Sequence, residues 1–132
     1  MKVLALDYGS ARTGVAVSDA TGTIARPLGV VERAASESGL ERLAQIVRDE
    51  GAVRVVVGLP LTLRGEHGAQ ARETDVFVAA LRARLEVPVE SYDERFTTDL
   101  AAGVGSDGAP EDARAAAHLL SSYLAWSSAA AE

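Results

Sequence analysis

The sequence contains no cysteine, and its aromatic residues are limited to one tryptophan, three tyrosines and two phenylalanines. Without cysteine, the chain can form neither a disulfide framework nor a thiolate metal site. It also lacks any run of about eighteen apolar residues, which excludes a membrane-spanning helix of ordinary length. The apolar stretch over residues 1–6 is shorter than the hydrophobic region of a signal peptide, and no cleavage motif follows it. We therefore expect a soluble, cytoplasmic protein with no membrane partner.

Basic side chains are in the minority. The chain has 13 lysine and arginine residues against 19 aspartates and glutamates, which gives a net charge of -6 and a pI of about 4.9. Proteins that bind nucleic acid usually carry a basic surface, so this balance weakens a nucleic-acid function without excluding it. An enzyme that binds divalent metal must collect acidic side chains in one place, and the observed charge is compatible with that requirement.

The 132 residues, 48% of them hydrophobic, fit a single domain covering residues 1–132. The first part of the chain is predicted to form three strands joined by short connections, at residues 1–8, 14–19 and 23–31. Short connections favour an antiparallel meander. Pro27 lies within the third strand and cannot donate a ladder hydrogen bond, which favours an edge position or a bulge there.

The spacing of apolar residues becomes helical after residue 37. Ser38 and Glu41 have the spacing of a capping box, and Gly51 occupies the place of a helix C-terminal glycine, which predicts a helix between them. The elements after it are a buried strand at 53–59, a helix at 69–85, a strand at 87–92, a short helical turn capped by Thr97 or Thr98, and a final helix from Pro110 to about Trp126.

The resulting element order, βββαβαβα, predicts an α/β protein. Right-handed crossovers through the helices place the first, fourth and fifth strands parallel to one another. The sheet is then mixed and five-stranded, with an antiparallel meander plus two parallel strands, and helices flank it. This arrangement resembles the RNase H-like fold.

Three acidic residues stand where strands end or a helix begins. Asp7 ends the first strand, Glu94 follows the fifth strand, and Asp112 lies in the first turn of the last helix. Each has a structural explanation on its own, as a turn former, a surface ion pair or an acid near the positive end of a helix dipole. In the predicted topology, however, all three meet at the carboxyl edge of the sheet, where α/β proteins bind ligands. Hydrolysis of phosphodiester bonds with Mg²⁺ or Mn²⁺ needs such a cluster of carboxylates.

Four segments carry motifs that follow one another in a recognisable order. They are LALDYGSARTGVAVSD (4–19), VVVGLPLTLRGEHG (55–68), YDERFTT (92–98) and DARAAAHLLSSYL (112–124). They resemble the YqgF family, also called RuvX-like, which comprises pre-16S ribosomal RNA nucleases and homologues of Holliday-junction resolvases. The resemblance implies an RNase H-like fold and Mg²⁺- or Mn²⁺-dependent cleavage of structured nucleic acid.

The same resemblance implies roles for individual residues. Asp7, Glu94 and Asp112 would be the catalytic residues and the metal ligands. Arg12 and Arg95 match basic positions of the family motifs and would bind substrate phosphate, for which a planar guanidinium is well suited.

The segment before the final helix departs from the family pattern. Relatives carry a stretch rich in lysine and arginine there, whereas Gly103–Pro110 has no basic residue. The departure leaves the substrate open between a ribosomal RNA precursor and branched DNA such as a four-way junction. Symmetrical cutting of a four-way junction requires a homodimer. The role of Asp93 and the number of metal ions, one or two, also stay open.

Two other functions agree with part of the sequence. The first segment, residues 4–19, also resembles the phosphate loop of sugar-kinase and actin-like ATPases, but those proteins bind nucleotide between two related domains. A binding module that has kept the fold and lost catalysis would explain the missing basic stretch and the negative charge. The complete set of three acids argues against such a module.

The remaining side chains with chemical potential receive structural interpretations. His67 is expected to be an exposed loop residue, and His118 and Tyr123 to be packed or solvated rather than to bind a ligand. Trp126 is expected to pack against the sheet or a partner subunit.

Overall fold

A five-stranded mixed sheet forms the centre of the computed structural model, which describes residues 1–97 and 109–130, with side chains described as far as Ser127. Its strands are β1 (Val3–Asp7), β2 (Arg12–Ser18), β3 (Ala25–Glu32), β4 (Arg54–Leu59) and β5 (Val89–Asp93). They lie in the order β3-β2-β1-β4-β5, with β1, β4 and β5 parallel and β2 antiparallel to both of its neighbours. The predicted meander plus two parallel strands is therefore confirmed.

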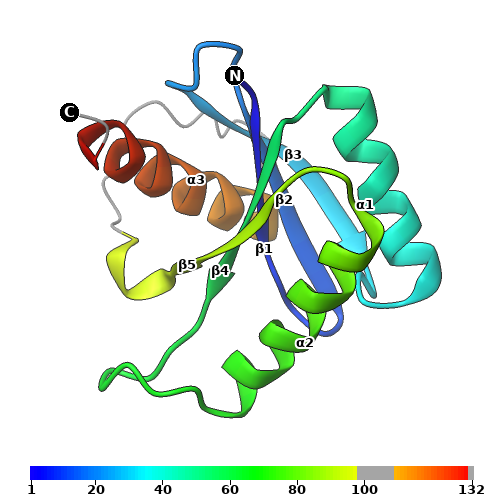
Figure 1. Ribbon diagram of the computed structural model, residues 1–132, viewed down its shortest axis with the longest axis vertical. Coiled ribbons are helices and arrows are strands. Elements are labelled where there is room, and N and C mark those ends of the chain that lie inside the picture. Colours follow the sequence, from blue (N-terminus) through cyan, green and yellow to red (C-terminus); the bar gives the residue numbers. More distant parts are fainter. Residues whose placement is uncertain (98–108, 131–132) are drawn as a thin grey trace.

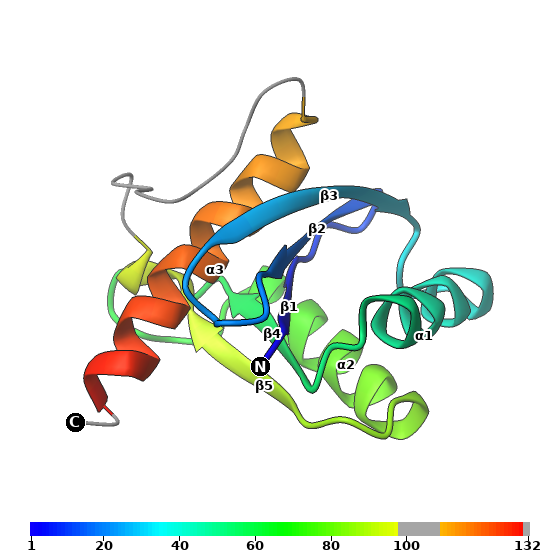
Figure 2. The ribbon, with the colours of Figure 1, turned by 90° about the horizontal axis from the view of Figure 1, so that it is seen from above.

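Helices cover both faces of this sheet (Figure 1). They are α1 (Glu37–Glu50), α2 (Ala69–Arg84) and α3 (Glu111–Ala130), and a short 3-10 turn, η1 (Glu94–Phe96), follows β5. Figure 2 shows α1 and α2 on one face of the sheet and α3 on the other. No helix in the described ranges is both long enough and apolar enough to cross a membrane.

Alternate residues of β1 supply two hydrophobic cores. Leu4 and Leu6 belong to the core on the side of α1 and α2, whereas Val3 and Ala5 belong to the core on the side of α3. Successive strand residues point to opposite faces, so Asp7 follows Val3 and Ala5 toward α3. The core beneath α3 is rich in alanine, which lets the helix approach the sheet closely: Ala5, Ala16, Ala25, Ala116 and Ala117.

Gly14 of β2 fixes the place where α3 begins. A Cβ atom at this position would lie 1.8 Å from the carbonyl oxygen of Asp112 and 2.4 Å from its carbonyl carbon. Only glycine lets two stretches of backbone approach this closely. Gly14 is also paired with Asp7 across the β1–β2 ladder. The first turn of α3 is thereby seated beside the end of β1.

β3 is an edge strand and carries a bulge. Val15 of β2 pairs with Gly29, but the next residue, Ala16, pairs with Pro27, so Leu28 is an extra residue in the ladder. Both the edge position and the bulge that Pro27 favoured are therefore present. Proline has no amide hydrogen to donate, which is tolerated in an edge strand and beside a bulge, where the ladder is interrupted.

The start of α1 differs from the prediction. Its N-cap is Ser36, whose side chain accepts a hydrogen bond from the Gly39 amide at 3.1 Å, so the capping box predicted at Ser38 is wrong. The turn that leads into the helix lies against it: a Cβ atom on Gly39 would lie 2.2 Å from the carbonyl oxygen of Arg33. This close contact with the preceding turn sets where the helix begins, and Ser38 falls inside its first turn.

The short helical turn predicted after β5 is present as η1, but its cap is Asp93 rather than a threonine. The Asp93 carboxylate accepts a hydrogen bond from the Arg95 amide at 2.9 Å. Thr97 follows the last residue of η1, and Thr98 lies outside the described residues. Residues 103–108, which make up most of the segment that lacks the family's basic residues, also lie outside them.

Candidate active site

Asp7 and Glu94 reach the same face of the sheet from different strands. Asp7 is the last residue of β1 and points to the α3 side, as Val3 and Ala5 do. Glu94 directly follows β5 and has the same strand parity as Tyr92, which is buried in the core beneath α3. Both carboxyl groups therefore lie at the carboxyl ends of parallel strands, the edge where α/β sheets bind ligands.

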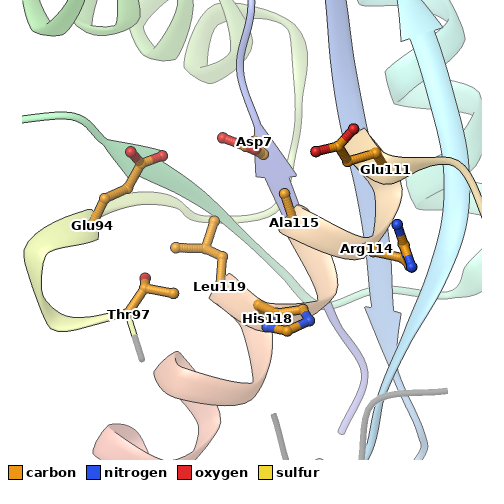
Figure 3. Close-up of a pocket in the computed structure, with 8 residues that line it drawn as sticks. All are labelled: Asp7, Glu94, Thr97, Glu111, Arg114, Ala115, His118 and Leu119. Atoms are coloured by element: carbon orange, nitrogen blue, oxygen red, sulfur yellow. The ribbon is translucent and has the colours of Figure 1, made fainter. Parts of the chain in front are cut away.

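A glycine on the strand between them makes room for their contact. β4 lies between β1 and β5, and a Cβ atom on its Gly58 would lie 2.4 Å from Glu94 Oε1 and 2.9 Å from Glu94 Cγ. The Glu94 side chain therefore crosses directly over the β4 backbone. Figure 3 shows the carboxyl groups of Glu94 and Asp7 turned toward one another.

The Asp7 and Glu94 carboxyl groups are hydrogen-bonded to each other. Burial, together with the negative charge of Asp7, raises the pKa of Glu94 from 4.5 to about 7. Burial also raises the pKa of Asp7, while the hydrogen bond from Glu94 opposes that rise and the charge of Asp112 adds to it. Below about pH 7 the pair therefore shares a proton, which Glu94 donates to the Asp7 carboxylate.

Asp112 is brought to the same edge but faces Arg12. The contact of its backbone with Gly14 places it near Asp7, close enough for its charge to raise the pKa of Asp7. Its Oδ2 lies 3.3 Å from Arg12 Nε, in an ion pair whose side chains are 42% and 66% exposed. Within residues 1–97 and 109–130, no three acidic or histidine side chains form a ready-made cation site. The structure thus joins Asp7 to Glu94 directly and leaves Asp112 beside the pair.

A pocket of about 390 Å³ opens beside the two carboxyl groups (Figure 3). It is lined by Asp7, Glu94, Thr97, Glu111, Arg114, Ala115, His118 and Leu119. Sequence reasoning did not assign Glu111 or Arg114 to the site, and it expected His118 only to be packed or solvated. Positions 111, 114, 115, 118 and 119 recur at helical spacing, so one face of α3 forms a wall of the pocket. Counting this helical spacing from the acidic first turn of α3 could have identified Glu111, Arg114 and His118 as pocket residues.

Arg95 is engaged by its own neighbours. Its Nε lies 3.1 and 3.0 Å from the two carboxylate oxygens of Asp93, and its Nη2 lies 2.6 Å from Asp93 Oδ2. Its Nη1 donates to the carbonyl oxygen of Leu63 at 3.2 Å. Asp93 therefore pairs with Arg95, and these hydrogen bonds lower the pKa of Asp93. Of the two arginines predicted at the site, Arg12 lies beside Asp112. Arg95 instead links Asp93, which precedes Glu94, to the Leu63 carbonyl in the loop after β4.

Three other residues singled out in the sequence lie away from the pocket. His67 is exposed, and its Nδ1 lies 2.8 Å from Asp75 Oδ2. Tyr123 is buried and donates a hydrogen bond to the Glu90 carboxylate. Trp126 is half exposed, and its ring centre lies 5.9 Å from that of Tyr123.

Comparison with solved structures identifies the class of fold. Thermus thermophilus RuvC, solved in complex with a Holliday junction substrate, is similar with a TM-score of 0.70 and 17% identity, covering 98% of this chain and 96% of that one. A second Thermus thermophilus RuvC structure is similar with a TM-score of 0.69 and 16% identity, covering 98% and 97% of the two chains. At these identities the similarity establishes the fold alone. The chain has the RuvC-like RNase H fold that the element order predicted.

The sequence is closer to one family within this class. The RuvX family model, described as a Holliday junction resolvase, matches residues 1–126. A Chloroflexus aggregans protein named "Putative pre-16S rRNA nuclease" is 49% identical over 96 residues, 73% of this chain and 68% of that protein. The protein of that name from Rubrobacter xylanophilus is 46% identical over 130 residues, 93% of this chain and 91% of that protein. A Chloroflexus aurantiacus relative is 46% identical, and the aligned part spans 63% of its length. The chain belongs to the RuvX family, which confirms the YqgF resemblance.

Proposed function

We propose that this chain is a divalent-metal-dependent endonuclease that hydrolyses phosphodiester bonds in structured nucleic acid, with residues 1–132 acting as one nuclease domain. The observation that carries the proposal is the Asp7–Glu94 pair, two hydrogen-bonded carboxyl groups with raised pKa values on the wall of a pocket. Such a pair costs stability, and proteins keep such groups mainly where function needs them. Membership of a family whose relatives are named for nuclease activity supports the same function.

The acidic side chains fit a Mg²⁺ or Mn²⁺ ion. Carboxylate oxygens are hard ligands that both ions favour, and a proton now links Asp7 to Glu94 where a cation would balance both charges. Asp7 and Glu94 would hold the ion, and Asp112 would supply a third carboxylate on leaving Arg12. Bound metal of this kind supplies a water of lowered pKa as nucleophile and stabilises the charge on the leaving oxygen.

Arginines around the pair are suited to bind and orient the phosphate. Arg114 lines the pocket from α3, and Arg12 flanks it beside Asp112. A guanidinium group donates two parallel hydrogen bonds to phosphate oxygens, which fixes the orientation of the bound group. If Asp112 ligated a cation instead of pairing with Arg12, Arg12 would be free to contact substrate phosphate, the role implied by its motif.

The net charge of -6 weakens a nucleic-acid function, but the position of these arginines is compatible with one. Arg12 of β2 is paired with Asp112, and Arg114 of α3 lines the same pocket as Asp7 and Glu94. Net charge governs solubility, whereas the local distribution of charge governs where a polyanion binds. A basic rim around an acidic centre allows an acidic protein to bind nucleic acid at this one place.

The substrate we propose follows from the names of the relatives and the family. The relatives are named as pre-16S rRNA nucleases, and the family model is described as a Holliday junction resolvase. Two reactions should therefore be tested: maturation of the 5′ end of pre-16S rRNA and resolution of four-way DNA junctions. Resolution of a junction requires paired cuts, and therefore a homodimer that presents two sites related by symmetry.

The proposal is tested by cleavage of end-labelled substrates. Wild-type protein is incubated with an RNA that carries a 5′ precursor extension and with a four-way DNA junction, in EDTA, Mg²⁺ or Mn²⁺. We expect cleavage only with metal, and a loss of about a hundredfold or more in Glu94→Gln, because a neutral amide cannot replace the charge of a carboxylate ligand. Glu86→Gln, which neutralises an exposed glutamate outside the pocket, is the matched control. Binding of either substrate without cleavage under all metal conditions would favour the non-catalytic binding module instead.

A further inference from the structure

The turn that follows β4 is tightly closed by hydrogen bonds. The Thr62 amide donates to the Glu66 carbonyl at 3.0 Å, and the Gly65 amide donates to the Thr62 carbonyl at 2.8 Å. The Glu66 amide also donates to Thr62 Oγ1 at 3.1 Å. Gly65 has a φ of +80°, a left-handed conformation that favours glycine. Residues 62–66 therefore form one compact unit, which we call the β4 turn.

Arg95 ties the β4 turn to the corner of the molecule that carries Glu94. Its Nη1 donates to the Leu63 carbonyl at 3.2 Å, while its Nε and Nη2 bind the Asp93 carboxylate at distances between 2.6 and 3.1 Å. Its guanidinium lies against Gly65, where a Cβ atom would be 3.2 Å from both Nη atoms. The β4 turn and η1 lie on the same side of the molecule in Figure 1. One side chain thus connects the turn to the residues on either side of Glu94.

The tip of the β4 turn is presented to solvent. Leu63 is 95% exposed, and Arg64 is exposed and makes no ion pair with any other residue of the described part of the chain. Arg95 differs from Arg64 because its Nε, Nη1 and Nη2 all donate to protein oxygens. A guanidinium that is free and held on an ordered turn loses little conformational entropy when it binds a phosphate.

We infer that the β4 turn is a second substrate contact, in which Arg64 binds a backbone phosphate of the nucleic-acid strand beside the bond that is cleaved. Arg95 is then a positioning residue, which holds the turn at a fixed place relative to Glu94, rather than a phosphate contact as its motif implied. The inference rests on the nuclease function proposed above. It adds a contact outside the pocket and gives the Asp93–Arg95 ion pair a role in substrate binding.

The experiment measures binding without cleavage. A fluorescein-labelled RNA hairpin with a single-stranded 5′ extension is titrated with protein in EDTA over a series of salt concentrations. Arg64→Ala should weaken binding by about three- to tenfold and make the dependence of log K on log salt shallower by about 0.7–0.9, the value of one phosphate contact. Leu63→Ala, a neutral change in the same turn, should leave the salt dependence unchanged.

Double variants separate the two roles of arginine. Arg95→Ala should weaken binding by as much as Arg64→Ala, and the double variant by no more than either alone, because both remove the same contact. Gly65→Ala would place a Cβ atom 3.2 Å from both Nη atoms of Arg95, so the guanidinium must shift by a few tenths of an ångström, and binding should weaken in the same direction. Gly51→Ala introduces the same backbone strain at a φ of +67° with no atom within 4 Å of the new Cβ, and should bind RNA as the wild type does.

Two results would overturn the inference. Unchanged binding in Arg64→Ala would remove the contact, and losses in Arg64→Ala and Arg95→Ala that multiply in the double variant would make Arg95 an independent phosphate contact. Cleavage of the same RNA by wild-type protein with Mn²⁺ is scored separately. A protein that cleaves but shows no coupling contradicts only the inference about the turn, whereas one that binds with this coupling and never cleaves contradicts only the nuclease.

Discussion

Glu94 should make the metal-free protein less stable as the pH rises, and Glu94→Gln should remove that loss. The pKa of Glu94 is about 7 in the folded protein, against an ordinary value of 4.5 expected in the unfolded chain. Between these two pH values the folded state binds more protons than the unfolded state, so the free energy of unfolding falls as the pH rises. The stabilising contribution of protonated Glu94 is fully present below about pH 4.5. It is lost as the pH rises through about 7.

The size of the effect follows from the same two pKa values. Their separation corresponds to about 3 kcal/mol for a group fully shielded from water. Glu94 is only partly buried, and screening by solvent reduces this to roughly 1–2 kcal/mol. Glutamine has nearly the same shape as protonated glutamate, and its amide can donate to Asp7 as Glu94 does. Because the amide does not ionise, the variant keeps the hydrogen bond at every pH and loses the repulsion.

Urea and thermal unfolding in EDTA, at about pH 4 and about pH 8, measure the difference. The two proteins should be equally stable at the lower pH, and Glu94→Gln should be more stable by roughly 1–2 kcal/mol at the higher pH, or about 3–8 °C in Tm for a chain of this length. Glu86→Gln should follow the wild type throughout. A difference that is the same at both pH values, or a wild type that is the more stable at pH 8, would refute the shared proton.

Two further predictions concern the neighbours of Glu94. Asp7→Asn should melt at a higher temperature than wild type in EDTA, by an amount worth on the order of 1 kcal/mol. Mn²⁺ should narrow or reverse this difference in melting temperature, because it stabilises the wild type by mass action. A variant that is less stable in EDTA and responds equally to Mn²⁺ would make Asp7 a structural residue. Gly14→Ala should destabilise the protein by about 2 kcal/mol or more in urea unfolding, because its Cβ would lie 1.8 Å from the Asp112 carbonyl oxygen and must displace α3. A loss below about 0.5 kcal/mol would show that α3 can shift freely on β2.

The order of the elements could be predicted because each change of period is visible in the chain. The continuous apolar run of β4 and the left-handed glycine at Gly51 are local features, and the structure confirms both. The cap of α1 could not be predicted in the same way. Ser36 and Ser38 are both capping residues by type, and the choice depends on how Gly39 contacts a preceding turn that no periodicity describes.

In the candidate site, too, strand order could be predicted from the sequence, whereas contacts between distant residues could not. That Asp7 and Glu94 would share an edge follows from strand order alone, since parallel strands end at the same side of a sheet. Their direct contact does not follow from it, because it needs a residue without a side chain at Gly58 on the strand between them. The partners of Arg95 were equally hidden, as Leu63 lies 32 positions away in a turn whose shape depends on its own hydrogen bonds.

In the proposed nuclease, Asp7 and Glu94 together form the metal site. Anomalous diffraction at the manganese edge, from crystals grown with Mn²⁺, tests it most directly because the signal locates the ion without reference to activity. We expect a manganese peak in contact with both carboxylates, with Asp112 turned away from Arg12, and no peak at this place in Glu94→Gln crystals. A peak at another place, or one equally strong beside Asp7 in the variant, would contradict the account.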